Sequence, residues 1–340
     1  MSLSSKSFSS DVTVQPAPGA QVVLGDVTLN GVSHLVVTGV GGGGASLKIG
    51  GNDIDESDGC SSHVTFEYLT YTRGVVVEPR SSCAVNMDLV WDHDRFDNLG
   101  SQTWEGRFNV QALNSGPHQP DGVTISNSHF GGSGAGSDCS DGIDILGNAD
   151  GTVIGPGNEF TGMAQGTCAA HVDPVQFDGE YADTVITGNY FHGNGDGSGG
   201  LMSPDEDGAY TVTNNVFDET GTYPWAVVMG GCFDPAPCTV SHNVFINAGV
   251  EIGPANEGPA TLGAIVKNNV FDNTGIVILG SGNTYTATYN LNAGLNGTGN
   301  INGTPLYTTS PATGYYHYQL APTSPGHNAA SDGKNIGIGP

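Results

Sequence analysis

Basic side chains are scarce in this sequence. The chain carries 8 Lys and Arg against 34 Asp and Glu, which gives a formal net charge of −26 at pH 7. Such a negative surface repels the phosphates of nucleic acids and the headgroups of anionic lipids. We therefore expect no nucleic-acid partner. The same acidity suits bound Ca²⁺ or a high-salt habitat, so calcium stays an open candidate although nothing in the sequence requires a cofactor.

Long apolar runs are also lacking, which excludes a segment that crosses a bilayer as a helix. We expect no membrane partner. Charged residues make up only 12% of the chain, whereas it holds 54 Gly and 18 Pro. Glycine and proline in such numbers break the chain with turns, so the composition favours a soluble, turn-rich, all-β protein.

The six cysteines lack the CxxC spacing of a zinc site, and their even number favours disulfides. Disulfides persist in oxidising compartments, so we expect a secreted protein. The first residues, MSLSSKSFSS, lack the apolar centre of a signal peptide, and we suppose that an export signal has been removed and a new Met added. Nearest-neighbour pairing, one of several connectivities that the sequence leaves open, gives Cys60–Cys83, Cys139–Cys168 and Cys232–Cys238.

Internal repetition is the strongest pattern in the chain. Seven segments end in Phe, and two residues before each Phe stands a short polar residue, which is Asn in five cases. The spacing runs from 26 residues (Phe191 to Phe217) to 34 (Phe96 to Phe130), too long for hairpins and without a helical period, so each repeat predicts one turn of a coil. The Phe residues are Phe96, Phe130, Phe160, Phe191, Phe217, Phe245 and Phe271, and the polar residues are Asp94, Ser128, Asn158, Asn189, Asn215, Asn243 and Asn269.

This pattern predicts a single-domain, right-handed parallel β-helix of about ten coils, with Phe rings stacked inside and Asn amides forming a hydrogen-bonded ladder at a bend. A second strand follows each Phe segment, and its apolar residues alternate, as Ile143 and Ile145 do. The residues between them should therefore face outward, with their counterparts in successive coils about 4.8 Å apart. The predicted outward column is Asn109, Asp144, Gln176, Met202, Val228, Glu251 and Val277, which is polar at its early end.

The chain end, YHYQLAPTSPGHNAASDGKNIGIGP, resembles the closing segment of many secreted bacterial β-helix proteins. Together with the repeats, it is similar to the pectin-lyase-like superfamily over nearly the whole chain. The resemblance implies one domain over residues 1–340, with N-terminal coils and a cap (1–60), regular coils (61–290) and a closing segment (291–340). The superfamily holds hydrolases, lyases, epimerases, phage tailspikes and adhesins, so it implies a fold more than a function.

Two neighbouring coils resemble polygalacturonase-type hydrolases in part. SDGIDI (140–145) and VDPVQF (172–177) are similar to the family's NTDGxDI and DDCxAI strands. The match sets Asp141 and Asp173 at the positions of family aspartates, and Val172 at that of a third. The family's later GHG and RIK motifs have no counterpart, because the corresponding strand reads SGGLMS.

Glycoside hydrolysis requires one carboxylic acid that protonates the leaving oxygen and a second carboxylate that activates water or attacks the sugar. Asp141 and Asp173 lie at the same point of adjacent coils, so their repulsion would keep a proton on one of them. His171, two residues before Asp173, could tune that carboxylate or carry a proton. We expect these three catalytic candidates to share a solvent-open cleft. The alternative is that both aspartates cap turns and that His171 is a turn residue.

Substrate binding would fall to side chains around the same coils. The amide of Gln176 suits a sugar hydroxyl, and Arg107 could clamp a uronate or instead pair with Glu105. The expected substrate-binding residues are Asn109, Arg107, Asp144, Gln176, Asp178 and Trp104.

The sequence thus predicts a secreted enzyme that cleaves a polysaccharide, in the first place a glycoside hydrolase with paired aspartates. A polysaccharide lyase acting on a uronate-containing glycan is the second hypothesis, and it would leave an unsaturated product that absorbs ultraviolet light. A non-catalytic glycan-binding or tailspike-like module is the third. The chain has no coiled-coil heptads of the kind that join subunits, so we expect a monomer.

Overall fold

The computed structural model describes residues 1–339 outside 41–46, 56–59, 80–81, 84–86, 98–105, 113–118, 121, 133–138, 148, 180, 196, 198, 204–207, 220–224, 233–236 and 254–260. Within these residues the chain forms 32 β-strands and one short 3-10 helix, η1 (Tyr315–Tyr318). The strands pair in parallel throughout. The all-β prediction is therefore confirmed.

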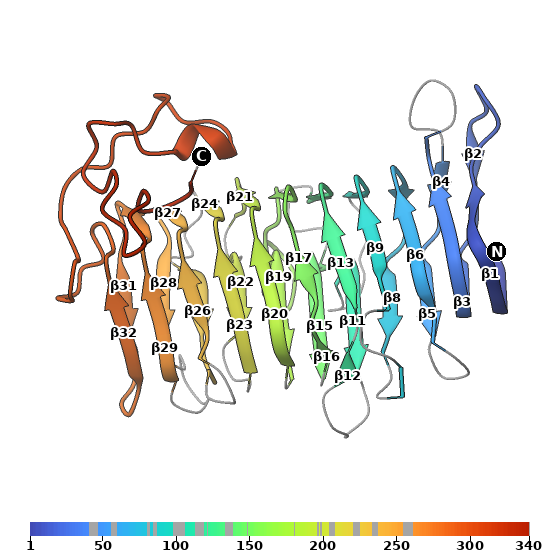
Figure 1. Cartoon of the computed structure of the whole chain (residues 1–340), viewed down its shortest axis with the longest axis horizontal. Helices are drawn as coiled ribbons and strands as arrows, with labels where there is room; N and C mark the ends of the chain where they lie inside the picture. Colours follow the sequence, from blue (N-terminus) through green and yellow to red (C-terminus); the bar gives the residue numbers. More distant parts are fainter. Residues whose placement is uncertain are drawn as a thin grey trace.

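The strands form two long stacks and one short one, and successive coils add strands to each (Figure 1). The first stack is β1 (Ser2–Val14), β3 (Val27–Thr38), β6 (Ser62–Glu67), β9 (Leu89–Asp92), β13 (Val123–Ser126), β17 (Val153–Ile154), β20 (Tyr181–Thr187), β23 (Gly208–Thr213), β26 (Thr239–Ser241), β29 (Leu262–Lys267) and β32 (Thr284–Thr288). The second stack starts from β3 and continues through β5 (Asn52–Asp55), β8 (Val75–Glu78), β11 (Phe108–Ala112), β15 (Ile143–Gly147), β19 (Val175–Asp178), β22 (Leu201–Ser203), β25 (Trp225–Met229), β28 (Gly249–Ile252) and β31 (Ile276–Ile278). Two short strands, β12 (Gln119–Pro120) and β16 (Ala149–Asp150), pair beside the first stack.

The short stack is a ten-stranded sheet in the described part of the chain, so it matches the prediction of about ten coils. Its strands are β2 (Val22–Val23), β4 (Leu47–Ile49), β7 (Thr70–Tyr71), β10 (Arg95–Asp97), β14 (His129–Gly131), β18 (Glu159–Thr161), β21 (Tyr190–His192), β24 (Val216–Asp218), β27 (Val244–Ile246) and β30 (Val270–Asp272). The molecule is a parallel β-helix whose coils advance along its long axis.

The predicted Phe stack lies inside the short sheet. From Phe96 to Phe271 every ring in the series is fully buried, and neighbouring ring centroids are 4.5 to 5.1 Å apart. Tyr71 extends the stack by one coil, with its ring 4.4 Å from that of Phe96. The rings follow the spacing of parallel strands because each Phe occupies the same place in its coil.

The predicted Asn ladder runs beside the Phe stack. The backbone N–H of Asn215 donates to Asn243 Oδ1 at 2.8 Å, and that of Asn243 donates to Asn269 Oδ1 at 2.9 Å. Each amide thus binds a backbone group of the preceding coil and ties the two coils together. The residue before each ladder Asn often adopts a left-handed conformation, with φ of 56° at Asn214 and at His242.

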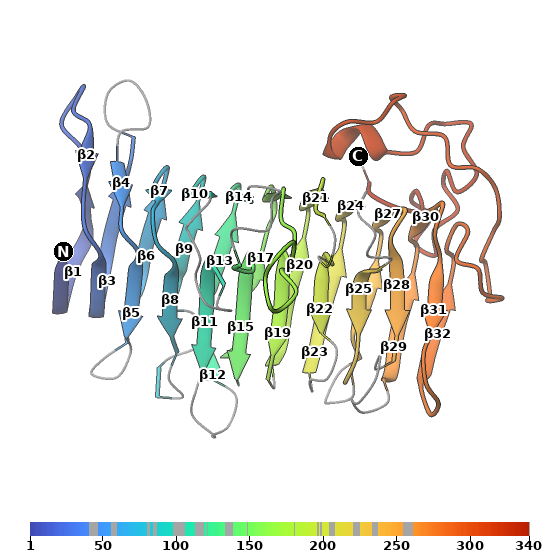
Figure 2. The same cartoon turned by 180° about the vertical axis from the view of Figure 1, so that it is seen from behind.

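The C-terminal segment folds back over the last coils (Figure 2). Tyr318, Leu320, Ile336 and Ile338 form one buried cluster with three valines on the outer face of the short sheet. Those valines, Val216, Val244 and Val270, begin β24, β27 and β30. Burying these valines helps to hold the C-terminal segment against the coils, since apolar area leaves water on both surfaces.

The three predicted disulfides are present. Cys60–Cys83, Cys139–Cys168 and Cys232–Cys238 are bonded, and the structure has no free cysteine. Cys60–Cys83 and Cys139–Cys168 join equivalent loops of consecutive coils, whereas Cys232–Cys238 closes a short loop between β25 and β26 of one coil. In the described residues, no helix has the length and apolarity needed to cross a membrane.

Candidate acid–base site

The second stack carries the column that the sequence predicted, in the predicted register. Asn109 pairs with Asp144, Asp144 with Gln176, and Gln176 with Met202, and the column continues through Val228 and Glu251 to Val277.

Facing outward leaves few side chains of this column exposed to solvent. Asn109, Asp144, Met202, Val228 and Glu251 are buried, whereas Gln176 is half-buried. Alternation along a strand determines which face a side chain takes, but not whether other parts of the chain cover that face.

Asp141 and Asp173 come together two residues before paired strand positions of β15 and β19. Asp141 Oδ1 accepts the backbone N–H of Asp173 at 2.5 Å, and Asp173 Oδ1 accepts the backbone N–H of Gly199 at 2.7 Å. Each carboxylate therefore caps the next coil, as the alternative hypothesis of turn caps requires. The expected open cleft is not found around these two groups, because Asp141 is 5% exposed and Asp173 is 0% exposed.

His171 is the member of the trio that reaches solvent. Its Nδ1 hydrogen-bonds the second carboxylate oxygen of Asp173, and the imidazole is 42% exposed. This hydrogen bond raises the pKa of His171, helped by the negative charges of Asp173 and Asp144 and opposed by partial burial. The result is an exposed imidazole whose orientation and basicity depend on a buried carboxylate.

Asp141 lies in an acidic surrounding that favours its neutral form. Burial raises the pKa of its carboxyl well above the usual range, and the charges of Asp144 and Asp173 raise it further. The hydrogen bond from the Asp173 backbone and the charge of Arg107 oppose this shift without reversing it. Asp141 can therefore hold a proton where an ordinary aspartate would have lost it.

Arg107 is buried beneath this group. Its Nη1 donates to the backbone oxygen of Ser140 at 2.6 Å and to that of Asp141 at 3.1 Å. The guanidinium is fully shielded from solvent, so it does not offer the exposed clamp for a uronate that the sequence suggested. Glu105, the alternative partner, lies outside the described residues.

The other predicted binding residues divide by burial. Asn109 Oδ1 and Asp144 Oδ2 both accept the backbone N–H of Gly106, at 2.9 and 3.0 Å, so these two side chains brace the turn before β11. Gln176 is half-buried and Asp178 is exposed at the end of β19. Trp104 lies outside the described residues.

Glu219 is a buried acid near this site that the sequence analysis missed. Its Oε1 accepts a hydrogen bond from Asn194 Nδ2 at 3.2 Å, and Asn194 Oδ1 accepts the backbone N–H of Met163 at 3.1 Å. The pKa of Glu219 is raised to about 7, mainly by burial; hydrogen bonding with Asn194 opposes this shift, and the charges of Asp218 and Asp173 add to it. The sequence does contain a signal for this pair. Asn194 stands three residues after Phe191, and Glu219 stands two residues after Phe217, the next Phe of the stack.

The acidity of the chain leaves calcium as an open candidate. Within the part of the chain that the structure describes, no group of three or more His, Cys, Asp and Glu side chains has the arrangement of a metal site. The acidic residues around Asp141 instead bind backbone N–H groups and an imidazole.

Comparisons with known proteins find structural likeness but no relative in sequence. No protein-family model matches the chain, and no curated protein matches it. The PL6 family alginate lyase AlyGC aligns with 100% of this chain and 56% of its own, at 14% sequence identity and a TM-score of 0.42. An arginine-to-alanine mutant of that protein gives a TM-score of 0.43 with the same identity and coverage. This chain spans about half the length of those chains.

Proposed function

We propose that this protein is a secreted enzyme that cleaves a polysaccharide by acid–base chemistry at His171. The observation that carries the proposal is an exposed imidazole held by the fully buried carboxylate of Asp173. Such a partner fixes the imidazole in one orientation and stabilises its protonated form, which makes neutral His171 a stronger base. Secretion is proposed from the three disulfides, which persist in oxidising compartments.

The reaction that suits this arrangement best is β-elimination from a uronate-containing glycan. Hydrolysis by two carboxyl groups needs both of them at the sugar, but Asp173 is 0% exposed and its two oxygens already hold Gly199 and His171. Elimination needs one base and one acid, and a single imidazole can serve as both. The lyase hypothesis is therefore preferred to the hydrolase.

The proton balance of this step is simple. Neutral His171 takes the proton from the carbon next to the uronate carboxyl, and a carbon–carbon double bond forms as the bond to the glycosidic oxygen breaks. The imidazolium then returns the proton to the leaving oxygen, so the base is regenerated. Asp173 positions the imidazole. Asp141 in its neutral form adds no further negative charge near the substrate carboxylate.

The net charge of −26 repels a uronate chain at long range. Salt limits this repulsion to a Debye length of about 8 Å at physiological ionic strength, so groups close to His171 decide whether the glycan binds. We therefore expect turnover to rise when NaCl is raised from low to physiological concentration, which is opposite to the behaviour of an enzyme that attracts its substrate electrostatically.

The decisive experiment measures ultraviolet absorbance and reducing ends together on alginate, polygalacturonate and neutral xylan. We expect both signals to rise together on a uronate polymer. Reducing ends without absorbance would overturn elimination in favour of hydrolysis, and neither signal on any polymer would remove the enzyme assignment.

Matched histidine variants test whether His171 is responsible. His171→Asn should abolish both signals. His93 is the control because it is 43% exposed and its Nδ1 lies 2.6 Å from Asp92 Oδ2, in the turn between β9 and β10. His93→Asn should keep full activity, since Asn accepts the positive φ at that position.

A further inference from the structure

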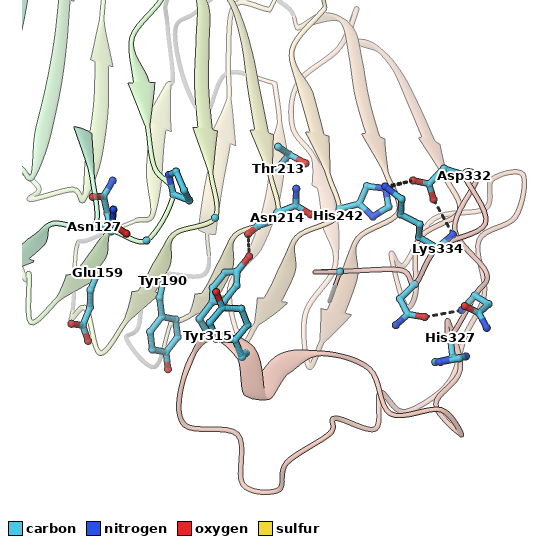
Figure 3. Close-up of a pocket in the computed structure, with 18 of the residues that line it drawn as sticks. Asn127, Glu159, Tyr190, Thr213, Asn214, His242, Tyr315, His327, Asp332 and Lys334 are labelled. Atoms are coloured by element: carbon cyan, nitrogen blue, oxygen red, sulfur yellow. Dashed lines mark hydrogen bonds and ion pairs between the residues drawn. The ribbon is translucent and has the colours of Figure 1, made fainter. Parts of the chain in front are cut away.

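A hollow lies between the bends of the middle coils and the C-terminal segment. It has a volume of about 1270 Å³, and its lining combines turn residues of the coils with residues 315–339 (Figure 3). Glu159 and Tyr190, at the starts of β18 and β21, belong to the coil side. The hollow adjoins the turns that enter the short strands, whereas His171 and Asp173 follow the ends of those strands. The two sites are therefore separate.

The walls of the hollow are held together by contacts between distant parts of the chain. The Tyr315 hydroxyl donates to the backbone oxygen of Asn214 at 2.5 Å. His242 Nδ1 lies 3.3 Å from the backbone oxygen of Gly337, and its Nε2 lies 3.5 Å from Asp332 Oδ2. These contacts hold the C-terminal segment over the bends, so the fold itself determines the shape of the hollow.

The lining mixes apolar and polar surface and carries little net charge. It contains two carboxylates, Glu159 and Asp332, and one ammonium group, that of Lys334. Asp332 is already engaged, because its Oδ2 lies 3.6 Å from Lys334 Nζ and 3.5 Å from His242 Nε2. Much of the remaining polar lining consists of asparagine, namely Asn127, Asn214, Asn328, Asn335 and the ladder residue Asn158. Amides suit a ligand that offers hydroxyl groups rather than formal charges.

Asn214 offers such a group. Its backbone N–H donates to the Ser241 oxygen at 3.3 Å and its backbone oxygen accepts from Tyr315, but none of the described residues hydrogen-bonds its side-chain amide. Figure 3 shows this side chain among the lining residues, beside Tyr315. The backbone of Asn214 is left-handed, with a φ of 56°, and this conformation at the bend determines where its side-chain amide lies.

Aromatic rings complete the surface. Tyr316 is 72% exposed. Among the large hydrophobic side chains of the described residues, Val23 alone is more exposed. Its ring stands nearly perpendicular to that of Tyr315, with the centroids 5.0 Å apart. Tyr190 stands on the coil side of the hollow, stacked on His192 at 4.2 Å. Rings that combine an apolar face with a hydroxyl suit the mixed apolar and polar faces of a sugar.

We propose that this hollow binds a neutral oligosaccharide, independently of the chemistry at His171. Its volume exceeds the range of about 300 to 1,000 Å³ that is common for sites of single small molecules, so it has room for several sugar units. Asn214 supplies hydrogen bonds and Tyr316 supplies a stacking face. A second site of this kind would hold a neutral chain beside the segment that is cleaved.

The test is isothermal titration calorimetry on the full chain carrying His171→Asn, so that turnover at the first site cannot consume the ligand. The probes are cellohexaose, xylohexaose and mannohexaose, with hexagalacturonate as the acidic comparison. We expect at least one neutral hexaose to bind, and Tyr316→Ala to weaken that binding by about tenfold or more. Asn214→Gly should also weaken it, because Gly removes the amide yet accepts the positive φ.

The control is Tyr285→Ala, which removes a tyrosine that is 40% exposed on β32 and not part of the lining. It should leave the affinity unchanged. The proposal is overturned if no neutral hexaose binds, if hexagalacturonate alone binds, or if Tyr316→Ala and Tyr285→Ala bind equally well. Because the proposed elimination is measured on uronate polymers with active His171, its failure would leave this binding result untouched.

Discussion

His171 and Asp173 form a pair of unequal accessibility: the imidazole is 42% exposed, whereas the carboxylate that it binds is 0% exposed. The buried partner cannot touch a substrate, so its effect on chemistry must pass through the imidazole. The same carboxylate accepts the backbone N–H of Gly199, which ties the orientation of His171 to the next coil. Asp173 therefore serves both the proposed chemistry at His171 and the contact between coils.

This pair gives a pH dependence with a defined sign. Asp173 raises the pKa of His171 above its usual value of about 6.5, so the neutral base becomes fully available only at higher pH. We expect kcat/KM on a uronate polymer to rise with pH through a midpoint above about 6.5. Asp173→Asn should move that midpoint down and lower the plateau by about 10²-fold or more, as measured by ultraviolet absorbance from pH 5 to 9.

A structural role for Asp173 alone predicts a different outcome for the same variant. The melting temperature would fall, because the amide weakens the bonds to Gly199 and His171, but the midpoint of the pH profile would stay in place. The pH profile of His93→Asn is the control for this comparison, because in the parent His93 is also bound to an aspartate.

Much of the fold was predictable because parallel coils repeat residue types at the same position. The spacing of Phe191 and Phe217 located the stack, and the alternation around Ile143 and Ile145 gave the strand register. The disulfide Cys139–Cys168 followed from two loops that precede equivalent strands.

The burial of the candidate site was not predictable in the same way. Periodicity places Asn109 and Asp144 on the outer face of their strands but does not encode what covers that face. The C-terminal contacts were also missed, although Val216, Val244 and Val270 form an apolar row at outward positions. Such a row on a surface strand indicates that another segment packs there, and this signal was present in the repeated Asn-Val-Phe triplets.

The Phe stack should be sensitive to a single truncation. Phe217 lies between Phe191 and Phe245, with ring centroids 4.5 and 5.1 Å away, and all three are fully buried. Phe217→Ala should lower the free energy of unfolding by roughly 3–5 kcal/mol, since it removes contacts on both faces and leaves a cavity. Chemical denaturation measures the loss. A loss below about 1 kcal/mol would show that the coils close around the gap, whereas Phe217→Leu should be milder in either case.

The disulfide Cys139–Cys168 should matter for the site more than for the whole molecule. It closes a separation of 29 residues and joins the segments that lead into Asp141 and His171. The double variant Cys139→Ser/Cys168→Ser should raise KM and increase hydrogen exchange over residues 139–173 below the melting temperature. The matched control is Cys232→Ser/Cys238→Ser, which opens a loop of only 6 residues in another coil. Equal effects of the two double variants on KM would contradict a local role.

Glu251 should make the protein less stable at neutral and alkaline pH. The side chain is 1% exposed on β28, and none of the described residues hydrogen-bonds either carboxylate oxygen. Burial raises its pKa from 4.5 to about 7, so the folded chain binds more protons here than the unfolded chain between those values. The stabilising effect of this proton is complete below pH 4.5 and is lost as pH rises through about 7.

Glu251→Gln removes this titration while keeping nearly the same shape. We expect the variant to be more stable than the parent by about 1–3 kcal/mol at pH 8, where the parent must keep a buried charge, and equal or slightly less stable at pH 5, where both side chains are neutral. Thermal melts at the two pH values measure the difference. Glu67→Gln, at the end of β6, controls for the loss of one negative charge from a chain of net charge −26. If both variants gain the same stability at pH 8, the gain comes from reduced overall repulsion, and the burial of the Glu251 charge does not destabilise the fold.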